Sequence, residues 1–169
     1  MAEQKTRRRA LLAKIETVYG QDSIPNGAAN AIAARSLEPT PLDAELLENP
    51  IIRPEYGNFE QVHVGANVKI DVEIALAGAG VVDTVPAYGV LLRACGFSET
   101  VNTGVSVEYS PVSDSHESAT LYFHHNNNLH SITGARGTVQ LDFNVKEYPM
   151  AKFSFVGLYS PVSTSSLPT

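Results

Sequence analysis

The stretch that decides the fold is Val68–Ile74, with the sequence VKIDVEI. Its even-numbered positions are apolar and its odd-numbered positions are charged. Because successive side chains of a strand point to opposite faces, this alternation predicts a strand with one buried and one solvated face. Similar alternation recurs in Val101–Tyr109, Ala119–Phe123, Val139–Val145 and Ala151–Phe155. Turn-forming residues separate these segments, which predicts a mainly β protein, an antiparallel sandwich or small barrel.

One flanking α-helix is predicted between the strands, over residues 86–95. The apolar residues that recur there at helical spacing are Tyr88, Leu91, Leu92 and Cys95. They form a stripe that should pack on the sheet or in the mouth of a barrel. Asp83 or Thr84 can cap the start of this helix, and Gly96 can end it.

The chain of 169 residues is expected to form one domain, residues 1–169, in four parts. Residues 1–20 are a basic N-terminal arm in which apolar residues at helical spacing predict a short helix. Residues 21–62 hold five prolines and predict an irregular arm with an apolar loop, although a short edge strand near Arg35–Leu42 is allowed. Residues 63–159 are the β core, and the Ser/Thr/Pro-rich residues 160–169 predict a flexible tail.

Charge is distributed unevenly along the chain. Residues 1–14 carry five basic residues against one acidic residue, whereas the remainder carries seven basic against seventeen acidic residues. DNA binding depends on clustered Lys and Arg that release counterions, so the acidic body should not wrap DNA. No apolar run approaches the roughly 20 residues of a membrane-spanning helix, so no membrane partner is expected. The N-terminus lacks the pattern of a secretory signal.

Candidate catalytic groups do not form a constellation. Cys95 has no neighbouring His in the sequence and lies on the apolar stripe of the predicted helix, so it should be a small core residue. Asp71 and Glu73 alternate with core residues like any solvated strand face, which argues against acid–base catalysis. No enzyme activity is expected.

The histidines near residue 125 are the one metal-like group in the sequence. His124 and His125 are neighbours in a predicted strand and therefore point to opposite faces. If Asn127 and Asn128 form a two-residue turn, His125 lies opposite His130. Two imidazoles lack the third protein ligand that zinc normally takes. No metal or other cofactor is expected, and the role of His125 and His130 stays open.

Four segments, in their order and spacing, carry a resemblance to a known family. They are residues 86–96 (PAYGVLLRACG), 105–113 (VSVEYSPVS), 134–138 (GARGT) and 153–159 (FSFVGLY). Together they resemble the major tail tube proteins of long-tailed, siphovirus-type bacteriophages, over roughly residues 6–160. The resemblance implies a structural virion protein that forms hexameric rings, which stack into a hollow tail tube for DNA passage. It implies no enzyme activity and no cofactor.

The partners implied by the resemblance are copies of the chain itself and other phage tail proteins, with viral DNA passing through without specific binding. The location implied is the virion tail, after the host cytoplasm before assembly. Two alternatives stay open: a tail terminator or completion protein that forms one ring, and a carbohydrate- or ligand-binding β-sandwich. The latter needs exposed aromatics, whereas Phe123, Phe143, Phe153 and Phe155 are predicted to alternate into the core.

Two segments are predicted to join subunits. The loop from Leu46 to Tyr56 is too apolar for an idle surface loop, and its candidate contact residues are Leu46, Leu47, Ile51, Ile52 and Tyr56. The basic arm, with Arg7, Arg8 and Arg9, should meet the acidic body of an adjacent subunit between rings. The sequence does not decide which solvated strand face lines the channel.

Overall fold

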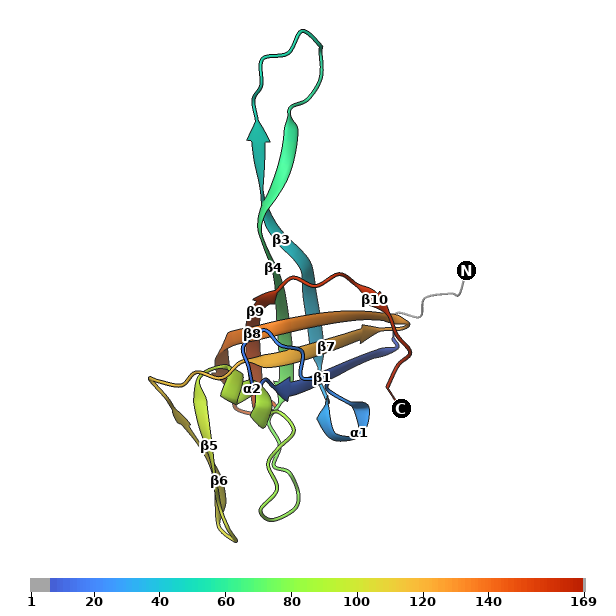
Figure 1. The fold of residues 1–169 in the computed structure, drawn as a ribbon. Coiled ribbons are helices and arrows are strands. Elements are labelled where there is room, and N and C mark those ends of the chain that lie inside the picture. Colours follow the sequence, from blue (N-terminus) through green and yellow to red (C-terminus); the bar gives the residue numbers. More distant parts are fainter. Residues whose placement is uncertain (1–6, 169) are drawn as a thin grey trace.

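The computed structural model describes residues 7–168 and is built mainly of antiparallel strands (Figure 1). The elements are β1 (Arg9–Ile15), α1 (Gly27–Asn30), β2 (Ala31–Ile32), β3 (Ser36–Asn49), β4 (Glu60–Ala75), α2 (Gly89–Ala94), β5 (Phe97–Asn102), β6 (Ser106–Pro111), β7 (Ala119–His125), β8 (Asn128–Asp142), β9 (Met150–Leu158) and β10 (Ser163–Thr164). This confirms the predicted β class, and the sheets form a sandwich that does not close into a barrel.

Strand β8 belongs to both layers of the sandwich. Its residues 128–135 pair with β7, and its residues 133–142 pair with β9. The strand order is β2-β1-β7-β8-β9-β4-β3, so β8 divides the path into sheet A (β2, β1, β7 and the start of β8) and sheet B (the rest of β8, β9, β4 and β3). The register shifts near Gly134, which has a φ of +61°. A bulge there lets one strand turn from one layer into the other, and Figure 1 shows the two sets of strands crossing steeply.

The core lies between the two sheets and confirms the alternation in the central segments. Val68, Ile70, Val72 and Ile74 are all buried, as are Ala119, Leu121, Phe123, Ala151, Phe153 and Phe155. The rings of Phe153 and Phe155 stack with centroids 5.9 Å apart. Helix α2 is confirmed but short, with Leu91 and Leu92 buried. The prediction that Asp83 or Thr84 caps the start is wrong, because Tyr88 precedes the helix without a side-chain cap. The predicted end is confirmed, because Gly96, at φ +86°, follows the last residues of the helix.

The predicted helix in residues 1–20 is wrong where the structure describes it. Residues 9–15 form strand β1, which pairs with β7 along its whole length. Leu11, Leu12 and Ala13 are buried in succession, so this strand is covered on both faces. The following segment covers the outer face, where the Ser23 N–H donates to Thr120 Oγ1 at 3.1 Å. A strand buried on both faces shows no alternation, and its apolar run imitates a helical stripe.

The predicted irregular arm of residues 21–62 is also largely wrong. The short edge strand expected near Arg35–Leu42 is the beginning of the 14-residue strand β3, which pairs with the 16-residue strand β4. Pro39 and Pro41 lie in β3, where they are tolerated because only β4 adjoins this edge strand. The register shifts between Thr40 and Glu45.

Four further predictions need correction. Residues 101–109 are not one strand: β5 and β6 form a separate two-stranded sheet with a turn between Asn102 and Ser106. Phe143, predicted in the core, is 69% exposed because β8 ends one residue before it. The tail is not wholly irregular, because β10 pairs with β8. The β7–β8 turn is one residue earlier than expected, so His125 pairs with Asn128 and not with His130.

Residues 1–6 of the basic arm and Thr169 of the tail lie outside the described residues. Within the part that is described, no helix is both long enough and apolar enough to span a membrane.

Candidate subunit interface

The candidate contact residues in the loop lie on a long projection of sheet B. Strand β9 pairs with β4 only from Asn67 onward, so the preceding part of β4 has β3 as its one neighbour. We call residues 42–66 the distal hairpin; it extends away from the sandwich at the top of Figure 1. Ile52 and Tyr56 are fully exposed near its tip, and Leu46, Leu47 and Ile51 are about half exposed or more.

This projection is an unusual place for large apolar side chains. Further exposed apolar residues on the distal hairpin are Leu42, Phe59, Val62 and Val64. Covering one such side chain contributes about 1.5–3 kcal/mol, and an exposed apolar set of this kind marks an interaction surface. The structure brings all five predicted loop residues onto this one projection. That a neighbouring subunit covers them stays a prediction.

The three arginines of the arm lie at the far end of sheet A. Arg7, Arg8 and Arg9 are exposed, and Arg9 begins β1 opposite His125. The backbone carbonyl of Arg8 accepts a hydrogen bond from the Asn126 N–H at 2.7 Å, which holds the arm at the β7–β8 turn. The structure therefore separates the arm from the distal hairpin of the same chain, as Figure 1 shows.

Sheet B has two open edges, which the sequence did not locate. One is the outer side of β3, and the other is the side of residues 136–142 of β8 that faces away from β9. Among the described residues no strand pairs with either side. Because β8, β9, β4 and β3 are successively antiparallel, the two edge strands run in opposite directions. Open edges are templates for pairing with another chain.

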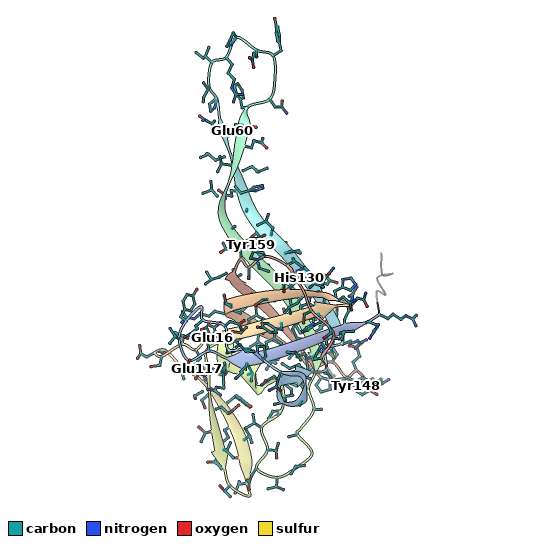
Figure 2. The ribbon with its side chains drawn as sticks, turned by 45° about the vertical axis from the view of Figure 1, so that its right-hand side comes forward. Glu16, Glu60, Glu117, His130, Tyr148 and Tyr159 are labelled. Atoms are coloured by element: carbon teal, nitrogen blue, oxygen red, sulfur yellow. The ribbon has the colours of Figure 1, made fainter. Side chains whose placement is uncertain are left out.

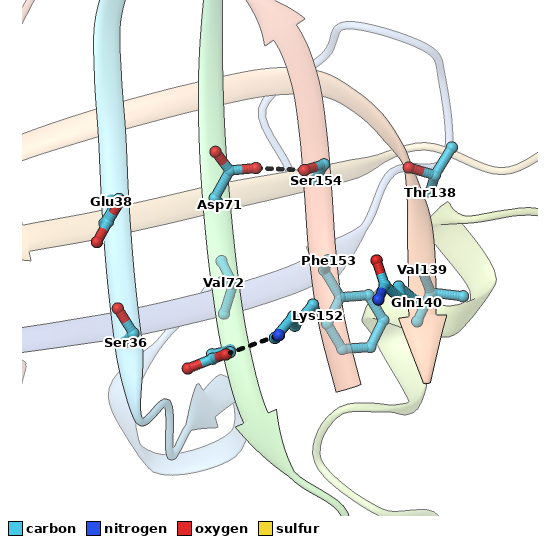
Figure 3. Close-up of a pocket in the computed structure, with 11 residues that line it drawn as sticks. Ser36, Glu38, Asp71, Val72, Thr138, Val139, Gln140, Lys152, Phe153 and Ser154 are labelled. Atoms are coloured by element: carbon cyan, nitrogen blue, oxygen red, sulfur yellow. Dashed lines mark hydrogen bonds and ion pairs between the residues drawn. The ribbon is translucent and has the colours of Figure 1, made fainter. Parts of the chain in front are cut away.

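The outer face of sheet B carries more acid than base. A shallow depression of about 450 Å³ crosses it, lined by Glu38, Asp71, Glu73 and Lys152 among others (Figure 3). Lys152 pairs with Asp142 at 2.8 Å and with Glu73 at 3.6 Å, and Ser154 donates to Asp71. The hydrogen bond from Lys152 lowers the pKa of Asp142. Asp71, Glu73 and Asp142 are engaged by neighbours as on an ordinary solvated strand face, and the excess of acid over base does not favour phosphate binding.

The remaining candidates for chemistry are Cys95 and the histidines near the β7–β8 turn. Burial raises the pKa of the Cys95 thiol to about 12, so the thiolate needed for a nucleophile is not formed near neutral pH. Burial, and to a lesser degree His125, lower the pKa of His130. His130 lies opposite Phe123, with ring centroids 5.7 Å apart. Across residues 7–168 no three His, Cys, Asp or Glu side chains are placed to hold a metal ion.

A second projection, at the opposite end of the molecule, was missed from the sequence. It consists of the β5–β6 hairpin and the loop before α2, tied at their tips by the hydrogen bond from Gly104 N–H to Asp83 Oδ1. At its base Arg93 binds Glu117 through two hydrogen bonds of 2.7 Å, and the Tyr109 hydroxyl donates to Glu99 at 2.8 Å. The signal for its turn was Asn102-Thr103-Gly104 inside the presumed strand.

Fold and surface together describe a β-sandwich that carries many of its exposed apolar residues on two projections. The model of the family described as phage tail tube protein matches residues 6–169. The chain therefore belongs to the phage tail tube protein family, and it is a non-enzymatic, structural component of a virion tail.

Solved structures share this fold at low sequence identity. The cap that terminates the tube of the anti-feeding prophage matches with a TM-score of 0.57 and 9% identity, over 98% of this chain and 93% of that one. The sheath/tube terminator of the extracellular contractile injection system PVC, in the extended state, matches at 0.56 and 9%, over 98% and 99%. The sheath–tube complex of that system matches at 0.52 and 8%, over 93% and 88%. No match was found among curated proteins.

Proposed function

We propose that this chain is the building block of a siphovirus-type tail tube: six copies form a ring, rings stack into a hollow tube, and viral DNA passes through it. The observation that carries this proposal is the pair of open, oppositely directed edges of sheet B. Membership of the tail tube family supports it.

Ring closure follows from strand direction. Rotation about an axis roughly parallel to the strands preserves their direction. The outer edge of β3 in one copy therefore meets the free edge of β8 in the next copy as an antiparallel neighbour. Sheet B would continue around the ring with the strand order it has within the chain. A head-to-tail contact of this kind closes into a ring when the rotation fits.

The lumen would be lined by the outer face of sheet B. Sheet A covers the other face of sheet B. Sheet A would therefore form the outer layer of the ring, where the circumference is larger. The lumen-facing residues would then include Glu38, Asp71, Glu73 and Asp142, with Lys69 and Lys152 engaged in ion pairs. Such a surface offers few free cations to phosphates, so DNA can slide without adhering.

Stacking would use the predicted contact residues. The distal hairpin reaches beyond the sandwich along the strands of sheet B, the direction of the tube axis in this arrangement (Figure 1). Leu46, Leu47, Ile51, Ile52 and Tyr56 would be covered by the next ring, and Arg7, Arg8 and Arg9 would bind acidic surface there. The outer side of the tube would contact other tail proteins.

Electron microscopy of the purified full chain tests the assembly. We expect tubes with sixfold rings. Paired cysteines on the two edges, Glu38→Cys with Gln140→Cys and adjacent same-face pairs such as Ser36→Cys with Thr138→Cys, should give a ladder of cross-linked species ending at six on oxidation. Each single variant is the control, with Cys95→Ser as background. A ladder absent from every pair, in a sample that forms tubes, would show that the ring closes through other surfaces.

A tail terminator is the second candidate, because two of the similar folds are a tube-terminating cap and a sheath/tube terminator. The two roles differ in growth. A terminator forms one ring that does not polymerise, so single rings at all protein concentrations would favour it over the tube.

A further inference from the structure

Three acidic side chains of the distal hairpin have no partner among the described residues. The hairpin carries Asp43, Glu45, Glu48, Glu55 and Glu60 against one arginine, Arg53. Asp43 binds Lys69 at 2.6 Å, and Glu48 accepts from Gln61 at 2.8 Å. Glu45, Glu55 and Glu60 are exposed and have no partner among residues 7–168. Figure 2 shows Glu60 on the projection, well away from the sandwich.

Most acidic groups elsewhere are already engaged. Glu16 is buried and hydrogen-bonded, Glu99 and Glu117 face Arg93, and Glu73 and Asp142 share Lys152. The outer face of sheet B therefore offers less unpaired negative charge than the distal hairpin does. The distal hairpin is therefore the acidic surface whose unpaired carboxylates need cations from a partner.

Three adjacent positive charges without an ion pair lie on the arm. Arg7, Arg8 and Arg9 are exposed and form no ion pair among the described residues. By contrast, Arg93, Lys69 and Lys152 are paired, and Arg136 lies 4.8 Å above the ring centre of Tyr19. Because the arm is held at the β7–β8 turn, its arginines lie at a different end of the molecule from the distal hairpin.

We infer that the basic arm of one copy binds the distal hairpin of a second copy. The guanidinium groups of Arg7, Arg8 and Arg9 pair there with Glu45, Glu55 and Glu60. This inference rests on the proposed tube function and names the partner of both predicted contact segments. The aliphatic part of an arginine side chain packs on apolar surface, and its guanidinium group stacks on aromatic rings. The exposed side chains of Ile52 and Tyr56 can therefore contact the same arginines. Because arm and hairpin are different surfaces at different ends of the molecule, each copy can bind one neighbour through its arm and another through its hairpin, which lets the contact continue from copy to copy.

Charge reversal tests the pairing. The arm variant carries Arg7→Glu, Arg8→Glu and Arg9→Glu; the hairpin variant carries Glu45→Arg, Glu55→Arg and Glu60→Arg. Each variant alone brings like charges together at every junction, and we expect tube growth at low salt to slow at least tenfold. In a one-to-one mixture, copies of the two variants that alternate bring opposite charges together at every junction. The mixture should therefore form tubes at close to the parent's rate, although each variant alone grows at least tenfold more slowly. A chain with both sets of substitutions should also form tubes.

A matched control separates pairing from net charge. Glu108→Arg, Asp114→Arg and Glu147→Arg change the charge by the same amount at exposed positions outside the hairpin, and this variant should assemble like the parent. Circular dichroism checks that every variant is folded. If the folded variants fail to rescue each other in the mixture, or if each assembles normally alone, the pairing is wrong. In both cases tubes from the parent chain would leave the proposed function intact; a parent chain that forms no tubes would contradict that function instead.

DNA is the other partner that a basic arm could bind, and the parent chain and the same variants test this alternative. If the parent chain retards duplex DNA at moderate salt, the arm variant does not, and the mixture forms no tubes, the arm binds DNA and not the hairpin.

Discussion

The carboxylate of Glu16 accepts a hydrogen bond of 2.7 Å from the backbone N–H of Gly134, 118 positions away in the sequence. Glu16 is buried and also accepts from Ser118 Oγ at 2.7 Å, Thr120 Oγ1 at 2.9 Å and the Gly20 N–H at 2.9 Å. This one side chain therefore joins the end of β1, the start of β7 and the bulge where β8 turns from sheet A into sheet B. In Figure 2 it lies near the end of β1, at the edge of the sandwich.

Glu16→Gln should destabilise the monomer by about 1–3 kcal/mol. The amide nitrogen of glutamine is a donor and would face donors, which leaves buried N–H or O–H groups unsatisfied. Chemical denaturation at neutral pH measures the loss. Glu108→Gln, on the exposed β5–β6 hairpin, is the matched control and should change stability by no more than about 0.5 kcal/mol. Equal stability of the two variants would show that the Glu16 network contributes little.

Acid should weaken the fold through the same group. Burial by itself would raise the pKa of Glu16, but hydrogen bonds from Ser118, Gly134, Gly20 and Thr120 together lower it below its ordinary value of 4.5. A carboxylate whose pKa is lower in the folded state stabilises the fold above pH 4.5, and this contribution disappears as the pH falls through the folded-state pKa.

The free energy of unfolding of the parent should therefore fall more steeply below about pH 4.5 than that of Glu16→Gln. Denaturation series at pH 3 to 7 compare the two proteins. Parallel curves would show that Glu16 does not titrate differently in the folded and unfolded states.

Two phenylalanines should respond in opposite ways to truncation. Phe155 is 1% exposed in the core, so Phe155→Ala should cost about 3–5 kcal/mol. Phe143 is 69% exposed, so Phe143→Ala should change monomer stability by only about 0.5 kcal/mol. Thermal and chemical denaturation of the monomer distinguish them. A large loss for Phe143→Ala would mean that the segment after β8 packs on the core.

The double variant Leu47→Ser, Ile52→Ser should remain a folded monomer and form no tubes. Both side chains are exposed in the chain, so their loss removes contacts only between copies. Electron microscopy and light scattering follow assembly, and circular dichroism follows folding. Val18→Ser, Ile24→Ser, on the exposed segment after β1, is the matched control. Normal tubes from the Leu47 and Ile52 variant would remove these residues from the interface.

The local pattern of apolar and polar residues was sufficient to predict a strand that has one buried and one solvated face. In Val68–Ile74 and Ala151–Phe155 the alternation of side chains follows from strand geometry alone, so the sequence identified both the strands and their buried faces. The short helix near Leu91 was predicted for the same reason, because its apolar spacing is local. The class of protein followed from the resemblance to tail tube proteins that residues 86–96, 105–113, 134–138 and 153–159 carry.

Contacts between residues that are distant in the sequence decided the structure of the segments that the local pattern did not predict. Leu11 and Leu12 are in a strand because β7 pairs on one side and the segment around Ser23 covers the outer face, a relationship that no local period records. Phe143 continues the alternation of its strand in sequence, yet β8 ends before it and leaves it exposed. The distal hairpin could not be predicted, because it forms where β3 and β4 stay paired beyond the point at which β9 stops. Pairing across a long turn depends on the partner strand and not on the residues of one strand alone.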